Sequence, residues 1–471
     1  MAQQTQFDLV IIGSGPGGYV AAVRAAQLGL KTAVVEKASR LGGVCLNVGC
    51  IPSKALLDSS EYYHLAKDRF AEYGIKTGKV TLDLAAMLAR KDKVVAELTE
   101  NVRKLLDGNN IEIIHGTASI PAPGSVEVDT GKKKKTILSA KNILLATGSE
   151  PIEVKGLEFD GKHIVSSTEA LSFDSVPKRL GIVGGGYIGL ELGSVWSRLG
   201  STVTVIEMLP KIATTLDGQV GRSLDRLLRK QGLDLRLKTR VTKAKTTTRQ
   251  VKVGVEDDKG GGEALTFDRL LVAVGRRPNS AGLGLKALGV AMDEKTGHVL
   301  VDENFQTSLP GVYAIGDLTP GPALAHKASA EGTAAVECIA GRAGEVNYDT
   351  IPAVVYTWPE VASVGLTEEA VKAKEIPYCV GSFPFSGAGR ARCMGETDGF
   401  VKLIAHSKTD RILGVHIIGP RAADMIAECV LAMEFGASSE DIARTVHGHP
   451  TFSEALMEAA LAVRKCSIYA S

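Results

Sequence analysis

The chain has 471 residues, more than one hydrophobic core usually organises, so its length predicts two to four domains. Hydrophobic residues make up 44% and charged residues 23%, the balance of an ordinary globular protein. The formal net charge is +2, with basic and acidic residues mixed along the chain, so no nucleic-acid partner is expected, and no apolar stretch approaches the length of a membrane span.

The N-terminus and the cysteine count bear on the compartment. Residues 1–6 lead directly into an apolar strand, without the cationic segment or the long apolar segment of a signal peptide. Seven cysteines, five of them scattered singly, do not match the framework of a secreted disulfide-rich domain. We therefore expect a cytoplasmic protein in a reducing environment.

The first predicted unit is a strand, a glycine-rich turn, a helix and a second strand. An apolar strand at residues 7–12 leads into Gly13-Ser14-Gly15-Pro16-Gly17-Gly18, a helix over residues 19–28, and a strand that ends in Glu36. In such a turn the first glycine permits a tight bend, the second lets a pyrophosphate approach the backbone, and the third lets the helix pack on the strand. The pyrophosphate lies at the helix N-terminus, and the acidic residue accepts hydrogen bonds from a ribose.

A pair of cysteines follows in residues 42–54, Gly-Gly-Val-Cys-Leu-Asn-Val-Gly-Cys-Ile-Pro-Ser-Lys. In a straight helix Cys45 and Cys50 would lie about 7.5 Å apart along the axis, too far for a relaxed disulfide, although Gly49 can supply a local distortion. So short a loop gains little stability from a disulfide, which favours a reversible redox couple. Two unpaired buried thiols explain this segment equally well by itself. Lys54 would share a helix face with Cys50 and favour a thiolate, although most helix lysines are simply exposed.

A second copy of the strand–turn–helix unit follows. A strand at residues 180–183 leads into Gly184-Gly185-Gly186-Tyr187-Ile188-Gly189, a helix over residues 190–199, and a strand that ends in Glu207. In both copies 16 residues separate the first glycine from the glycine that closes the helix (13 to 29, 184 to 200), and 23 separate it from the acidic residue (13 to 36, 184 to 207). Two matched copies predict two dinucleotide sites, and beside them the redox couple becomes the favoured interpretation of the cysteines.

Three more apolar strands end at glycine or an acid. Residues 143–148 and 270–275 lie 127 positions apart and are predicted to be equivalent strands of the two units, while residues 312–317 end in Asp317. From about residue 349 the strands are shorter (353–356, 400–404, 412–418) and are accompanied by helices such as 422–435. This pattern predicts an α+β C-terminal domain.

One histidine near the C-terminus differs from the rest. His449 precedes Pro450, which restricts it to an extended backbone, and Glu454 follows five residues later. A carboxylate at that position can orient an imidazole as a base. We interpret His447 as structural.

Together these segments resemble the class I pyridine nucleotide–disulfide oxidoreductases, most closely their dihydrolipoamide dehydrogenase branch. The resemblance covers essentially the whole chain and includes the cysteine segment, both glycine turns, and residues 275–279, 313–317, 324–327 and 447–451 with Glu454. It implies an α/β fold with two Rossmann-like domains and an α+β dimerisation domain. The implied divisions are an FAD-binding domain with the redox disulfide (1–150), an NAD-binding domain (151–278), a central segment that completes the FAD site (279–348) and the interface domain (349–471).

The resemblance also implies roles for individual residues, and no metal. FAD would be lined by Gly13, Gly15, Gly18, Glu36, Lys37, Gly43, Val44, Cys45, Lys54, Ala118, Thr147, Gly148, Ser149, Asp317, Ala323, Leu324, Ala325 and His326. NAD would be lined by Gly184, Gly186, Tyr187, Ile188, Gly189, Glu191, Glu207, Val241 and Gly275. Asp317 would contact the ribityl chain, and Lys54, beside the flavin ring, would pair with Glu191, since a buried lysine without a partner tends to lose its proton.

The implied reaction is the oxidation of dihydrolipoyl groups. His449, contributed by the other subunit of a homodimer, would remove a proton from a dihydrolipoyl thiol, whose thiolate attacks Cys45 of the Cys45–Cys50 disulfide. The oxidised lipoyl group leaves, and electrons pass from Cys50 through FAD to NAD+. The implied partners are the lipoyl domains and acyltransferase core of 2-oxoacid dehydrogenase complexes, or the lipoyl carrier protein of glycine cleavage.

Three other readings stay open. Glutathione reductases prefer NADP, but Glu207 would repel its 2′-phosphate. Mercuric reductases usually carry an extra cysteine pair near the C-terminus, where this chain has only Cys466. A non-catalytic structural subunit has no need for both cysteines together with His449 and Glu454.

Overall fold

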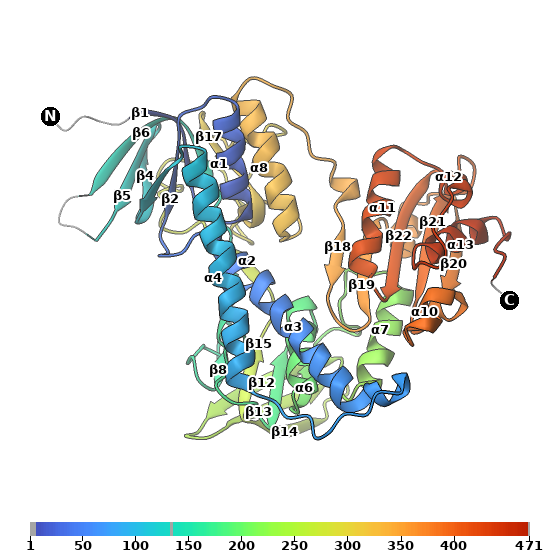
Figure 1. Cartoon of the computed structure of the whole chain (residues 1–471). Coiled ribbons are helices and arrows are strands. Elements are labelled where there is room, and N and C mark those ends of the chain that lie inside the picture. The colour runs from blue at the N-terminus through green and yellow to red at the C-terminus, as the bar shows by residue number, and fades with distance from the viewer. Residues whose placement is uncertain (1–5, 132–134, 470–471) are drawn as a thin grey trace. The chain divides into compact units, whose positions relative to one another are not determined.

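The structure is a computed structural model that describes residues 6–131 and 135–469. Residues 1–5, on which part of the signal-peptide argument depends, lie outside the described residues. The chain divides into two compact units (Figure 1), each built from three stretches of sequence. The first unit comprises Met1–Leu56, Ala85–Ile152 and Gly275–Val346; the second comprises Leu57–Leu84, Glu153–Val274 and Asn347–Ser471.

The first unit is built on a mixed sheet in the order β3-β2-β1-β6-β5-β4, with β17 also pairing with β6. Strands β1, β2, β3, β6 and β17 are parallel, and β4 and β5 add antiparallel pairs. Their bounds are β1 Gln6–Ile12, β2 Thr32–Glu36, β3 Glu112–His115, β4 Thr117–Ala122, β5 Ser125–Asp129, β6 Thr136–Leu145 and β17 Val312–Ala314. The parallel strands are mostly buried, as the continuous apolar runs of β1, β2 and the end of β6 predict.

Helices α1 (Pro16–Gln27) and α8 (Ala325–Ile339) pack side by side in this unit (Figure 1). Helix α4 (Leu84–Gly108) also contributes to its core through Val102 and Leu106. Helix α1 begins three residues before the predicted position 19, because the last residues of the glycine turn already form the first helical turn. The same holds for α6 (Tyr187–Arg198), which was expected to begin at residue 190.

The second unit repeats the strand order of the first. Its parallel sheet runs β11-β10-β9-β15-β8, so β11-β10-β9-β15 corresponds to β3-β2-β1-β6. The bounds are β8 Ile164–Val165, β9 Arg179–Val183, β10 Thr202–Ile206, β11 Asp234–Arg236 and β15 Arg269–Val272. The predicted equivalence of the strands that close the two units is confirmed. An antiparallel sheet of β12 (Thr239–Thr246), β13 (Val251–Asp257) and β14 (Gly262–Phe267) follows.

The C-terminal part of the second unit is an antiparallel sheet covered by helices (Figure 1). Its strand order is β18-β19-β22-β21-β20; α11 (Ala422–Glu434) packs on β19 and β22, and α13 (Glu454–Val463) packs on β20 and β21. The strands are β18 Ala353–Val355, β19 Glu360–Gly365, β20 Tyr378–Pro384, β21 Phe400–His406 and β22 Ile412–Gly419. The expected α/β fold with an α+β C-terminal part is confirmed, whereas the boundaries between the four predicted domains stay predictions.

The remaining elements are short or connect these layers. Helices α2 (Gly43–Val48) and α3 (Cys50–His64) carry the cysteines, and α7 (Gly218–Lys230) follows β10. The others are β7 Ser149–Pro151, β16 Arg276–Pro278, α5 Ser167–Ala170, α9 Glu368–Ala373, α10 Gly389–Cys393, α12 Ser439–Arg444, η1 Leu65–Arg69, η2 Phe70–Tyr73, η3 Gly316–Leu318, η4 Tyr348–Thr350 and η5 Phe385–Gly387. None of the helices in the described ranges combines the length and apolar character needed to cross a membrane.

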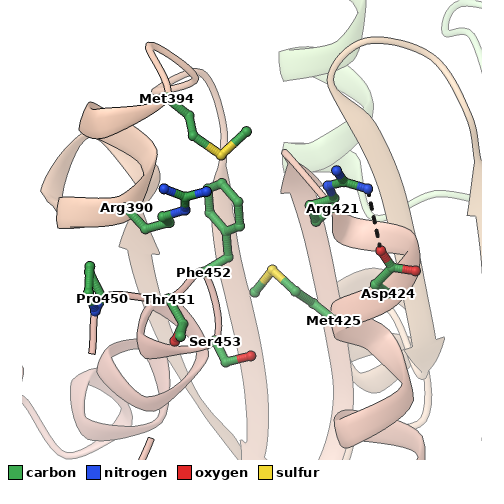
Figure 2. A pocket seen from close by; sticks show the side chains of 9 residues that line it. All are labelled: Arg390, Met394, Arg421, Asp424, Met425, Pro450, Thr451, Phe452 and Ser453. Carbon is green, nitrogen blue, oxygen red and sulfur yellow. Dashed lines mark ion pairs between the residues drawn. The ribbon is translucent and has the colours of Figure 1, made fainter. Parts of the chain in front are cut away.

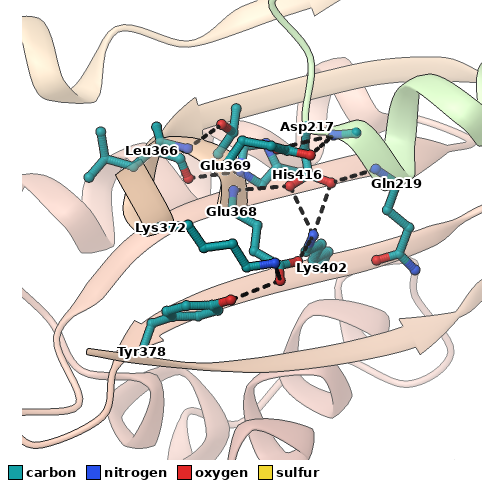
Figure 3. Close-up of polar contacts among 12 residues, drawn as sticks. Asp217, Gln219, Leu366, Glu368, Glu369, Lys372, Tyr378, Lys402 and His416 are labelled. Atoms are coloured by element: carbon teal, nitrogen blue, oxygen red, sulfur yellow. Dashed lines mark hydrogen bonds and ion pairs between the residues drawn. The ribbon is translucent and has the colours of Figure 1, made fainter. Parts of the chain in front are cut away.

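A buried polar cluster joins α7 to the C-terminal sheet of the second unit (Figure 3). Asp217 accepts the Gln219 N–H at the start of α7, and both of its oxygens lie 2.9 Å from Nζ of Lys402 on β21. Lys402 also contacts Glu368 at 2.7 Å. Burial raises the pKa of Asp217, but the hydrogen bonds from Lys402 and the Glu368 N–H, together with the charges of His416 and Lys402, leave the pKa lowered. Hydrogen bonds from Lys372 and Lys402 lower the pKa of Glu368 to about 2.

Candidate active site

The two glycine turns follow the carboxyl ends of β1 and β9. Gly13 and Gly184, the first glycine of each, have φ of +105° and +106°, and a Cβ at either would lie 2.4 Å from a backbone oxygen of the neighbouring strand connection. A Cβ on the last glycine, Gly18 or Gly189, would meet the carbonyl oxygen of the first glycine at 2.0 or 2.5 Å. The packing of strand and helix therefore explains both of these positions.

The middle glycine of each turn faces open space instead. A Cβ on Gly15 would find only Gly43 Cα, at 4.0 Å, and one on Gly186 would find nothing within 4 Å. These glycines are also the N-caps of α1 and α6, whose first turns carry no acidic residue and no side-chain cap. Unobstructed backbone N–H groups at a helix N-terminus fit the pyrophosphate of a dinucleotide.

Glu36 and Glu207, the acids that end β2 and β10, are held in the same way in the two units. Glu36 accepts hydrogen bonds from the Ser14 N–H (2.9 Å) and hydroxyl (2.6 Å) and from the Ala38 N–H (2.8 Å). Glu207 accepts the N–H groups of Gly185 and Leu209, both at 2.7 Å. Each carboxylate is fixed beside its glycine turn, where a ribose would lie. Ser14, the second residue of the first glycine turn, had no predicted role.

The cysteine pair spans a break between two helices. Helix α2 ends at Val48, Gly49 leaves the helical conformation, and α3 begins at Cys50. A Cβ on Gly49 would lie 2.9 Å from the Val44 carbonyl oxygen and 3.2 Å from Cys45 Cα, so no larger residue fits there. With this break, the side chains of Cys45 and Cys50 reach hydrogen-bonding contact. The Gly42 N–H donates to the Ser14 carbonyl, which ties the segment to the first glycine turn.

The surroundings of Cys45 favour its protonated form. The hydrogen bond to Cys50, burial and the negative charge of Cys50 raise the pKa of Cys45, and Lys54 opposes this only weakly. Burial and the charges of both cysteines raise the pKa of Tyr19, which places the first helical turn of α1 beside the pair.

Asp317 and Ser149, two of the predicted residues, contact each other directly, and Arg276, which had no predicted role, binds Ser149. Asp317 follows β17, and its carboxylate lies 2.5 Å from the Ser149 hydroxyl. Arg276 donates to both the hydroxyl (2.8 Å) and the carbonyl (2.6 Å) of Ser149. Burial lowers the pKa of Arg276, opposed by the charges of Asp317, Cys50 and Glu150. The sequence feature that could have pointed to Arg276 is its position directly after Gly275, the glycine that ends a predicted strand.

His449 and Glu454 form the expected pair. Nδ1 of His449 lies 2.8 Å from one Glu454 oxygen, and the other oxygen accepts the Thr451 N–H at 2.7 Å. Burial raises the pKa of Glu454, but these hydrogen bonds outweigh it, so the pKa is lowered. His447 is buried instead, between Glu428 (2.8 Å) and the Thr445 carbonyl (2.8 Å), which fits a structural role.

The other predicted residues lie in varied surroundings. Thr147 and Gly148 are braced by Asn279 through three hydrogen bonds. Lys54 belongs to the first unit and Glu191 to the second, where it accepts the Tyr356 N–H at 3.0 Å, so their pairing stays a prediction. Three of them, Lys37, Val44 and Ile188, are exposed, whereas Ala118 lies in the core of the first unit. Val241 is on β12, and the Tyr187 hydroxyl contacts Thr215. Residues Ala323–His326 precede or begin α8.

A surface pocket of about 430 Å³ lies in the C-terminal part, beside the loop that follows His449 (Figure 2). It contains none of the predicted site residues; its lining is Arg390, Met394, Arg421, Asp424, Met425, Pro450, Thr451, Phe452 and Ser453. Among residues 6–131 and 135–469, no three His, Cys, Asp or Glu side chains gather as a metal site requires.

Comparisons with known proteins match nearly the whole chain. Residues 7–332 match the family model described as pyridine nucleotide-disulphide oxidoreductase, and residues 351–460 match its dimerisation domain. The chain is 50% identical to a mitochondrial dihydrolipoyl dehydrogenase of Pisum sativum, with 97% of this chain and 91% of the relative covered. It is 51% identical to a leghemoglobin reductase of Vigna unguiculata (97% and 87% covered). Among solved structures it is similar to the flavoprotein disulfide reductase RclA of Escherichia coli as a Cu(II) complex, with a TM-score of 0.86, 28% identity and 97% and 99% covered.

Proposed function

Because the chain belongs to the pyridine nucleotide-disulphide oxidoreductase family, we propose that it is a dihydrolipoyl dehydrogenase, which oxidises dihydrolipoyl groups to lipoyl groups while NAD+ is reduced to NADH. Relatives with this name, 50% and 52% identical over 97% of this chain, support the proposal. The observation that carries the proposal is the contact of Cys45 with Cys50, directly beside the first glycine turn.

The glycine turns supply the fit to two dinucleotides. FAD is assigned to the turn of the first unit, next to the cysteines, with Gly15, Glu36 and Asp317 among its contacts. NAD is assigned to the second, with Gly186 and Glu207. The predicted Lys54–Glu191 pair beside the flavin ring is part of this assignment. FAD, when bound, supplies the chemistry of accepting an electron pair and giving it up to NAD+.

The cysteines carry out thiol–disulfide exchange. In the oxidised enzyme, a dihydrolipoyl thiolate attacks Sγ of Cys45, forming a mixed disulfide and releasing Cys50 as a thiolate. The second lipoyl thiolate then attacks the mixed disulfide, lipoyl leaves as a cyclic disulfide, and Cys45 is left reduced. The contact between the two cysteine side chains supports this exchange, because it brings both sulfur atoms within reach of the same substrate thiol.

His449 is the proposed base for the dihydrolipoyl thiols. The Glu454 carboxylate accepts a hydrogen bond from Nδ1–H of His449, which leaves Nε2 as the ring atom that takes the thiol proton. The dimerisation-domain match supports a homodimer, and we assign His449 to the active site of the other subunit. The proposed partners are lipoyl domains and the acyltransferase core of 2-oxoacid dehydrogenase complexes, or the lipoyl carrier of glycine cleavage. The cytoplasmic location stays a prediction, since the Pisum relative is named mitochondrial.

The test is a comparison of substrates with the purified full-length protein. Catalytic efficiency with dihydrolipoamide and NAD+ should exceed that with oxidised glutathione and NADPH by orders of magnitude. An equal or reversed preference would replace this function with that of a glutathione reductase. Absence of turnover with either pair, from a protein that holds FAD, would favour the structural-subunit reading.

A further inference from the structure

Helix α8 carries a buried ion pair that the proposed reaction does not use. Nζ of Lys327 lies 2.9 Å from Oε1 of Glu331, one turn later, and the side chains are 0% and 2% exposed. Removing two charges from water is costly, and a buried ion pair often stabilises a fold no more than apolar residues of similar volume. The contacts of this pair therefore indicate a role other than stability.

The pair holds both backbone groups of one residue, Gly316. The other Glu331 oxygen accepts the Gly316 N–H at 2.7 Å, and Lys327 donates to the Gly316 carbonyl at 3.2 Å. The Thr319 hydroxyl also donates to that carbonyl, at 2.9 Å, and lies 3.5 Å from Nζ of Lys327. Gly316 has φ of +73°, a left-handed conformation in which it must be held. The two charged groups thus fix the peptide planes on both sides of Gly316.

The next residue is Asp317, which lies at the ligand-binding edge of the sheet. Strands β1, β6 and β17 are parallel, so the residues that follow them lie together at their carboxyl ends. In open α/β sheets this edge is where ligands bind. The contact of Asp317 with Ser149 lies at this edge. A change in the backbone at Gly316 would redirect the Asp317 carboxylate.

We propose that Lys327 and Glu331 are positioning residues that set the backbone of Gly316 and so direct the Asp317 carboxylate at FAD. The inference rests on the proposed function, because FAD is the ligand assigned to this edge. The pair does not touch the reacting atoms; it acts through Asp317.

The test replaces both charges, so that neither is left buried without its partner. In Lys327→Met/Glu331→Leu, FAD should leave the holoprotein at least about tenfold faster than in wild type. The release rate is measured as the rise in flavin fluorescence after dilution. The visible spectrum of the bound flavin should also shift. The matched control is Arg24→Met/Glu337→Leu, which removes a partly exposed ion pair that links α1 to α8 and does not touch Gly316. The control should release FAD at the wild-type rate. Wild-type release by the Lys327/Glu331 variant would overturn the proposal.

Coupling to Asp317 separates positioning from a general loosening of the fold. In an Asp317→Ala background, the double substitution should change the FAD release rate by less than about twofold, because its route of action is already lost. A full tenfold effect in that background would show that the pair acts elsewhere and would also overturn the proposal.

A smaller substitution covers the case in which the double variant does not fold. Thr319→Val keeps the volume and removes only the hydroxyl that binds the Gly316 carbonyl, so FAD release should rise by a few-fold. An unchanged rate would then count against the proposal. If the wild-type protein neither contains FAD nor takes it up, the proposed function fails. If wild type binds FAD and the variants match it, only the present inference fails.

Discussion

The Glu454 carboxylate bridges the imidazole of His449 and the main chain, through Nδ1 at 2.8 Å and the Thr451 N–H at 2.7 Å. The imidazole is 78% exposed, whereas the Glu454 side chain is only 20% exposed. Within one chain the proposed base is thus exposed, while the carboxylate proposed to orient it is fixed by the main chain.

Removal of the base should slow thiol oxidation without loss of the flavin. We expect His449→Gln to lower the rate of dihydrolipoamide oxidation by ~10²–10⁴-fold, the usual contribution of a general base. His447→Gln is the control and should slow the reaction much less, because His447 is buried between Glu428 and a backbone carbonyl. Steady-state rates with acid-released FAD quantified in parallel would check both. Equal rate losses in the two variants would contradict the assignment.

Mixing two inactive chains tests whether the site is shared between subunits. Heterodimers of Cys50→Ser and His449→Gln chains contain one intact composite site if His449 serves the partner, so activity should return in proportion to the heterodimer fraction. If each chain is self-sufficient, both sites stay broken and no activity returns.

Glu454 gives a pH dependence with a defined sign. Its pKa is lowered in the folded protein because the hydrogen bonds from His449 and Thr451 outweigh burial. A carboxyl group of this kind stabilises the fold above its unfolded-state pKa, and the stabilisation is lost as pH falls through the folded pKa. The thermal midpoint of wild type should therefore exceed that of Glu454→Gln near neutral pH, and the gap should close as pH falls below about 4. A gap that is constant down to pH ~3 would refute this account.

The choice between NAD and NADP should depend on the charge of Glu207. The backbone N–H groups of Gly185 and Leu209 fix its carboxylate beside the second glycine turn. Glu207→Gln keeps the shape and an acceptor but removes the repulsion of a 2′-phosphate, so the NAD+/NADP+ ratio of kcat/KM should fall by about ten- to hundredfold, or about 1.4–2.8 kcal/mol. Glu36→Gln, the matching change in the first unit, should leave the ratio unchanged. Parallel shifts in both variants would disprove the assignment.

Lys402 should be a major contributor to the stability of the second unit. Lys402→Met leaves the buried carboxylate of Asp217 without its ion pair, and breaking such a pair typically costs about 3–5 kcal/mol. Lys372→Met is the matched control, because Lys372 also binds Glu368 but is exposed, and should cost less than about 1 kcal/mol. Denaturant unfolding of the two variants compares them directly. Equal losses would show that the burial of Lys402 carries no special weight.

The sequence predicted the features that depend on local patterns. The two glycine turns share their offsets because each is a complete strand–turn–helix unit, and the structure gives both units the same strand order. Cys45 and Cys50 lie five residues apart, and so do His449 and Glu454, so each pair could be predicted from one short segment. The helix starts were misplaced by three residues, because the last glycine of each turn must already lie in the first helical turn.

Other features depend on residues far apart in the chain. Arg276 reaches Ser149 across 127 positions, Asp317 reaches it across 168, and Lys402 meets Asp217 across 185. No periodicity links such residues, because the packing of whole elements brings them together. The four-residue spacing of Lys327 and Glu331 is typical of a helix. Their hydrogen bonds to Gly316, however, depend on how α8 packs against the residue that follows β17.

In the proposed reaction, electrons from dihydrolipoyl groups enter the protein through Cys45 and Cys50. The most direct measurement treats the oxidised holoprotein with one equivalent of dihydrolipoamide without NAD+, alkylates the thiols and maps the labels by mass spectrometry. New labels are expected at Cys45 and Cys50 only, with the labelling of Cys338, Cys379, Cys393, Cys429 and Cys466 unchanged. Formation of lipoamide while Cys45 and Cys50 keep their original labelling would contradict it.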